Sequence, residues 1–134
     1  MIELPLTIRY QPHPLRDTAA WLVPAGYVLA AAFPTNAIAG LHVTFIGGFA
    51  LLALLMSTQV TVGHGGYTDL RLGKPWIVPA LVVTMLTAIG FRAAMELDPR
   101  RFFVWMAAAA LAFLCGALMW VLFAVPKILK GPAD

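Results

Sequence analysis

Three histidines are the side chains of this 134-residue sequence that are best suited to bind a metal ion or a haem: His13, His42 and His64. Neutral imidazole is a common ligand of copper and a common axial ligand of haem iron. His42 and His64 are 22 residues apart. In a continuous α-helix that spacing places them ~33 Å apart along the axis and about 40° apart around it. The pair therefore predicts two separate sites on one helix face, and not one shared metal ion.

Each of these two sites needs further partners. On the His64 side, His13 supplies a second imidazole if the N-terminal segment folds back. On the His42 side the sequence holds no second histidine, so a second copy or a partner chain supplies the ligand, or a haem iron there is five-coordinate. An unpaired imidazole inside an apolar span costs roughly 1–3 kcal/mol per unsatisfied group. We therefore expect His42 to have a partner on another helix or chain.

Each candidate also has a purely structural interpretation. A histidine at the end of a span is often only interfacial, and the glycines around His64 either admit a flat ligand or simply stop the helix. Arg92 either pairs with Glu96 one turn on, which is the ordinary explanation, or contacts an anionic group such as a haem propionate. Methionines fill gaps more often than they bind copper, and this applies to Met56, Met85, Met106 and Met119.

The composition predicts an integral membrane protein. Hydrophobic residues make up 61% of the chain and charged residues 11%, and the mean hydropathy is +0.86. An average soluble domain carries roughly a quarter charged residues, so this chain cannot form a polar coat. Disorder is excluded by the same numbers. A single cysteine, Cys115, excludes an internal disulfide and any CxxC motif, and its apolar neighbours predict an inert thiol.

The predicted fold is an all-α bundle of four transmembrane helices. An extended segment, residues 1–16, precedes a four-helix transmembrane domain, residues 17–134. Asp17 is the expected N-cap of the first span, and Pro126 is expected to close the fourth. The second and fourth helices, which carry glycine- and alanine-rich faces, are expected to be the most buried in the bundle or at its interface with other chains. The four spans are predicted at about 18–33, 37–62, 75–94 and 99–125.

The basic residues predict the orientation of the bundle. Six lie on the side of the termini, and three, Arg92, Arg100 and Arg101, lie on the other. The excess predicts a multi-pass membrane protein with cytoplasmic N and C termini. No carboxylate lies near a midplane, which argues against a proton or cation carrier. No basic stretch is typical of nucleic-acid binding, and no motif of a classical enzyme is present.

One stretch resembles a known family. Residues 42–66 read HVTFIGGFALLALLMSTQVTVGHGG and resemble the C-terminal, four-helix portion of the NnrS family of bacterial membrane proteins. That family has a histidine opening a span, a glycine five residues on, a Met-Thr-Arg-like stretch and a closing Gly-His-Thr-Gly. Here His42 and Gly47 open the pattern, residues 57–59 (STQ) replace the middle stretch, and residues 63–66 (GHGG) close it. The tail FAVPKILKGP is also similar to the family's closing segment.

The resemblance implies a haem-binding membrane protein, with copper as a further option, linked to nitric oxide response or membrane redox chemistry. His42 and His64 are the implied ligands, and haem b is the expected cofactor. Whether the chain is an enzyme stays open, because redox chemistry at a bound haem is the only catalysis that the residues motivate. The alternative is a small structural or assembly subunit of a larger membrane complex. Both hypotheses expect contact with the lipid bilayer and with other membrane subunits or further copies of the chain.

Overall fold

The computed structural model describes residues 14–64 and 75–130, and in these residues every regular element is helical. A 3-10 turn precedes the second and the fourth long helix of the chain, and a π-helical stretch lies within the second long helix. The elements are α1 (Pro14–Ala32), η1 (Pro34–Asn36), α2 (Ala37–His42), the π-helix η2 (Val43–Ala50), α3 (Leu51–His64), α5 (Ile77–Leu97), η3 (Pro99–Arg101) and α6 (Phe102–Lys130).

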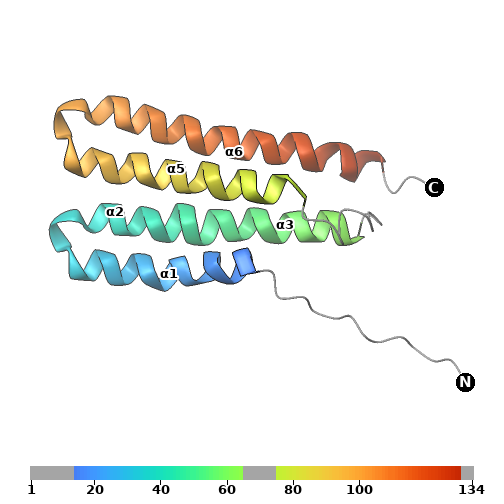
Figure 1. The fold of residues 1–134 in the computed structure, drawn as a ribbon, viewed down its shortest axis with the longest axis horizontal. Coiled ribbons are helices and arrows are strands. Elements are labelled where there is room, and N and C mark those ends of the chain that lie inside the picture. Colours follow the sequence, from blue (N-terminus) through green and yellow to red (C-terminus); the bar gives the residue numbers. More distant parts are fainter. Residues whose placement is uncertain (1–13, 65–74, 131–134) are drawn as a thin grey trace, which may run out of the picture.

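These elements form four antiparallel rods, since η1, α2, η2 and α3 run on as one helix (Figure 1). The connections at residues 33–36 and 98–101 lie at one end of the bundle. The start of α1, the end of α3, the start of α5 and the end of α6 lie at the other. Three helices are long and apolar enough to cross a membrane: Pro34–Gly63, Ile77–Leu97 and Pro99–Lys130. Helix α1 is the fourth rod and is not among these three.

Two expected boundaries are wrong. Helix α1 begins at Pro14, so residues 14–16 are helical and not extended, and Asp17 lies within the first turn, where its carboxylate is 3.3 Å from the Arg16 guanidinium. Proline suits this start because the first helical turn needs no backbone donor. Helix α6 continues through Pro126 to Lys130. A proline that close to a helix end removes one backbone bond from a helix already held by its neighbour.

Glycines hold α1 against the following helix. A Cβ atom at Gly40 would lie 2.5 Å from the Ala30 nitrogen and 2.8 Å from the Gly26 carbonyl oxygen. A Cβ at Gly26 would lie 2.6 Å from the Gly40 carbonyl oxygen and would overlap the Thr44 hydroxyl. That hydroxyl donates a 3.2 Å hydrogen bond to the Val23 carbonyl. The two backbones therefore approach more closely than any side chain would permit.

Burial confirms one half of the expectation for the second and fourth helices. In the most apolar stretch of each span, 33% of the residues are buried in Pro34–Gly63, 28% in Ile77–Leu97 and 22% in Pro99–Lys130. Of these three spans, the second helix is therefore the most buried and the fourth is the least. Helix α6 packs Gly116 onto Thr84 and Met85 of α5, while its opposite face exposes large apolar side chains such as Leu111, Leu114 and Leu118.

Candidate functional site

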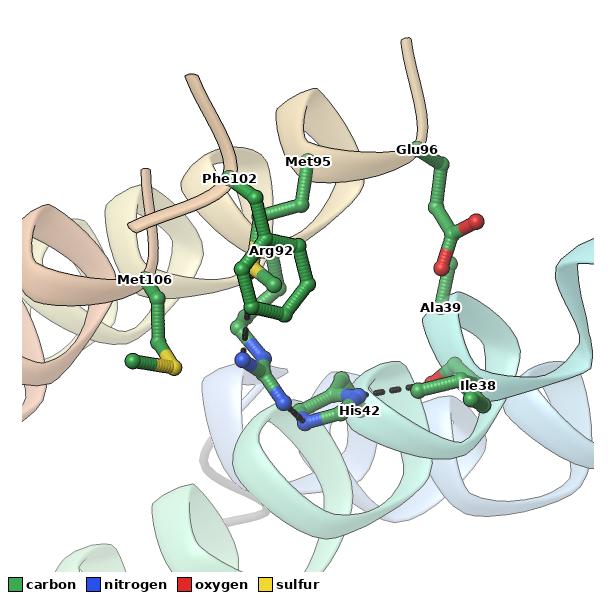
Figure 2. Close-up of a pocket in the computed structure, with 8 residues that line it drawn as sticks. All are labelled: Ile38, Ala39, His42, Arg92, Met95, Glu96, Phe102 and Met106. Atoms are coloured by element: carbon green, nitrogen blue, oxygen red, sulfur yellow. Dashed lines mark hydrogen bonds between the residues drawn. The ribbon is translucent and has the colours of Figure 1, made fainter. Parts of the chain in front are cut away.

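His42 makes two hydrogen bonds that together define its protonation. Its Nδ1 atom lies 2.6 Å from the carbonyl oxygen of Ile38, one turn earlier on the same helix. Its Nε2 atom contacts Nη2 of Arg92 on α5 (Figure 2). A guanidinium can only donate, so Nε2 accepts and Nδ1 carries the proton that the Ile38 carbonyl receives. The contacts therefore fit the Nδ1–H tautomer, with the Nε2 lone pair turned towards Arg92.

This arrangement confirms that His42 has a partner on another helix. Arg92 lies five residues before the end of α5, and its Nη1 donates to the Met95 sulfur at 3.3 Å. Among the residues that the structure describes, no ion pair joins Arg92 to Glu96, so in this conformation the ordinary partner of Arg92 is replaced by His42. The guanidinium instead links the second and third spans of the bundle.

A cavity of about 240 Å³ adjoins the His42–Arg92 pair, near the end of the bundle that holds the connections at residues 33–36 and 98–101. Its wall combines one cation, one carboxylate, one imidazole and two thioethers with apolar groups. The lining residues are Ile38, Ala39, His42, Arg92, Met95, Glu96, Phe102 and Met106 (Figure 2). Glu96 is half-buried here, and within the described part of the chain its carboxylate makes no hydrogen bond or ion pair.

The backbone at His42 changes from α- to π-helix. Helix α2 ends at His42, and η2 begins at Val43 and contains Gly47 and Gly48, both buried against neighbouring helices. A π-helical stretch has i→i+5 hydrogen bonds and is frequent at functional sites. It also alters the rotation per residue, so the 40° angle expected between His42 and His64 no longer follows from their spacing.

The structure brings His42 and Arg92 together and separates His42 from His64 along the helix. His64 is the last residue of α3, at the opposite end of the bundle from the cavity (Figure 1). The His64 side chain, the two glycines after it and His13 lie outside the described residues, so the second site stays a prediction. In the parts of the chain that are described, no three His, Cys, Asp or Glu side chains gather into a metal site. Cys115 is exposed.

Sequence reasoning overlooked several residues of the cavity wall. Met95 and Phe102 received no role, and Met106 was interpreted as a gap filler. Helical spacing offered a signal for two of the missing contacts, because Ile38 lies four residues before His42 and Met95 three residues after Arg92. Residues at these spacings share a helix face. The contact between residues 42 and 92 has no such signal, since it depends on how two distant helices pack.

The comparisons with known proteins agree with the pattern around His42. The family model described as "NnrS protein" matches residues 17–131, which includes α1 as well as the stretch after Ala37. Neither a curated protein nor a solved structure matches the chain. A match over most of the chain, together with three helices suited to a membrane, identifies it as a membrane protein, and the chain belongs to the NnrS family.

Proposed function

We propose that this chain binds a metal cofactor in the membrane, haem b or alternatively copper, with Nε2 of His42 as a ligand. The observation that carries the proposal is the state of His42 itself. The Ile38 carbonyl fixes the Nδ1–H tautomer and the ring orientation, as carbonyl partners of metal-binding histidines do. The lone pair at Nε2 is thereby aimed at the cavity side of α5. A link to nitric oxide response or membrane redox chemistry is part of the same proposal.

The residues fit part of a haem site. His42 would supply one nitrogen ligand to the iron, and Arg92 would hold a propionate by charge-assisted hydrogen bonds. The cavity of about 240 Å³ is smaller than the roughly 300–1,000 Å³ of ordinary ligand pockets, so it encloses only an edge of such a group. The remainder would lie against lipid or a second chain. Iron held by one protein ligand offers an open position to a small gas.

The same cavity offers a different set of donor atoms to copper. Thioether sulfurs and imidazole are ligands that favour Cu(I). Met95 and Met106 line the cavity with His42, and Met95 already accepts a hydrogen bond from Arg92 through its sulfur. In this version His42 and the two methionines hold the ion.

The absorption spectrum of the purified full chain, combined with elemental analysis, tests this proposal. Haem binding predicts a Soret band whose intensity corresponds to bound iron, and copper binding predicts stoichiometric copper without that band. The protein should be purified in mild detergent from the membranes of cells that were supplied with both haem and copper. Neither a Soret band nor bound copper would contradict the proposed function.

The small cavity favours a second candidate function, that of an assembly subunit in a larger membrane complex. In that case the exposed apolar faces of the helices contact other subunits as well as lipid. A stoichiometric partner that co-purifies after mild extraction supports this candidate. A monodisperse, cofactor-loaded particle made of this chain alone argues against it.

We further propose that all four helices cross the bacterial inner membrane, with both termini cytoplasmic. The 19 residues of α1 rise ~28 Å, which approaches the ~30 Å of a bilayer core. Arg16, Lys127 and Lys130 lie at the end of the bundle that holds the start of α1 and the end of α6. In the sequence six basic residues belong to this side of the bundle and three, Arg92, Arg100 and Arg101, to the other, and by the positive-inside rule this excess supports a cytoplasmic position for the termini.

Cysteine labelling in intact cells should report this orientation. In a Cys115→Ser background, Thr35→Cys and Arg100→Cys lie in the two connections at the same end of the bundle, and both are exposed. We expect a membrane-impermeant maleimide to label both from outside the inner membrane, and to label Lys130→Cys only after permeabilisation. If Thr35→Cys and Arg100→Cys respond differently, the helices Pro34–Gly63 and Ile77–Leu97 do not both span as proposed. Asp17→Cys, at the exposed start of α1, reports whether α1 spans: it should be labelled only after permeabilisation, like Lys130→Cys.

A further inference from the structure

The Nε2 atom of His42 has one lone pair, and Arg92 occupies it. Nδ1 carries the proton that the Ile38 carbonyl accepts, so Nε2 is the only ring atom that can bind an electron-pair acceptor such as a metal ion. The same atom accepts the hydrogen bond of Arg92 Nη2. The two uses exclude each other. Any ligand of His42 must first displace the guanidinium.

A second position for the guanidinium exists in the same cavity. Glu96 lies four residues after Arg92 on α5, a spacing at which helical side chains reach each other. Its carboxylate lines the cavity, and no described residue bonds to it. Figure 2 shows this carboxylate extending towards Ala39, while the guanidinium points to His42. Among the described residues, the one other bond that Arg92 must break is to the Met95 sulfur, which is a weak acceptor.

From these contacts we infer that Arg92 gates His42 and that Glu96 receives the guanidinium when the gate opens. In the closed state, which the structure shows, Arg92 bonds to Nε2 and Glu96 is unpaired. In the open state Arg92 pairs with Glu96 and Nε2 is free for an electron-pair acceptor. The exchange keeps the guanidinium partnered in both states, which limits its cost in the apolar surroundings. The inference rests on the proposed role of His42 as a ligand, and it adds the device that controls access to it.

The availability of Nε2 can be measured without any metal by carbethoxylation of the full chain in mild detergent. The free nitrogen attacks diethyl pyrocarbonate, a bond forms between Nε2 and the acyl carbon, ethyl carbonate leaves, and Nδ1 gives up its proton. The rate is followed at pH 8, where a free imidazole is neutral, by mass spectrometry of the peptide that contains His42. Only the open state of the gate reacts.

Arg92→Leu should raise this rate about 10- to 100-fold, the factor expected from losing one hydrogen bond to a charged group. Glu96→Gln should lower it several-fold, because the open state loses its ion pair while the closed state is unchanged. In the double variant the rate should equal that of Arg92→Leu, since Glu96 acts only through Arg92. Arg100→Leu, which removes an exposed cation at the same end of the bundle, should leave the rate unchanged.

An unchanged rate in Arg92→Leu overturns the gate. If that variant does not fold, Glu96→Gln decides alone, and a rate equal to or above that of the native chain overturns the role of Glu96. These rates are measured in the absence of haem and copper. A chain that binds neither cofactor can therefore still show the gate, and a chain that binds one can still lack it.

Discussion

His42→Ala is expected to lower cofactor loading by roughly 100-fold or more, because loss of even an outer partner of a metal ligand costs roughly 10–100-fold in affinity. The substitution removes the nitrogen at Nε2 and with it the proposed ligand. It also leaves the Arg92 guanidinium without its acceptor on the second span. Loading is measured as the Soret absorbance or bound copper per chain after parallel purification. Thermal unfolding of the same samples separates loss of the cofactor from loss of the fold.

His64→Ala is the matched comparison. His64 ends α3 at the far end of the bundle from the cavity (Figure 1). A histidine at the water boundary can be satisfied by solvent, whereas His42 depends on Arg92 and Ile38. We therefore expect His42→Ala to reduce loading at least as much as His64→Ala. Loss of the cofactor only in His64→Ala would show that His42 serves packing and that the glycine-flanked His64 carries the site.

The need for a partner at His42 could be predicted from the sequence, but its identity could not. A polar ring in an apolar span must be satisfied by some group, and this argument uses only the position of the residue. Local spacing pairs Arg92 with Glu96, and the sequence offers no reason to prefer a contact 50 residues away. The choice depends on the rotation of α5 about its own axis, which is decided by packing along the whole helix. The cavity and its two methionines follow from the same rotation.

The helical fold was largely predictable because apolar runs of membrane length have few alternatives. The π-helix η2 was not, because its residues 43–50 read as an ordinary apolar helix. Its position follows tertiary contacts: Thr44 bonds to the Val23 carbonyl of α1, and Gly48 lies where a Cβ would come 2.5 Å from Val23 Cγ2. The close contacts with α1 and the π-helical stretch next to His42 therefore fall on the same residues. The feature that positions the site is therefore a property of the packed pair of helices.

Gly40→Ala is expected to destabilise the bundle by about 2–3 kcal/mol, at the upper end of the range for overpacked sites. The added methyl would lie 2.5 Å from the Ala30 nitrogen and 2.9 Å from its Cα. Both are backbone atoms, so no rotamer change can make room, and α1 must move away from α2. That movement stretches the bond between Thr44 and Val23 and disturbs the backbone next to His42. The free energy of unfolding is measured in detergent by denaturant titration.

Gly90→Ala provides the control, since Gly90 lies in the middle of a helix and a Cβ there meets no atom within 4 Å. The same methyl group should stabilise α5 by about 0.5–1 kcal/mol, the usual advantage of alanine over glycine in a helix. The two substitutions are chemically identical, but they should change the free energy of unfolding in opposite directions. If Gly40→Ala were also neutral or stabilising, α1 would not be packed backbone to backbone against α2.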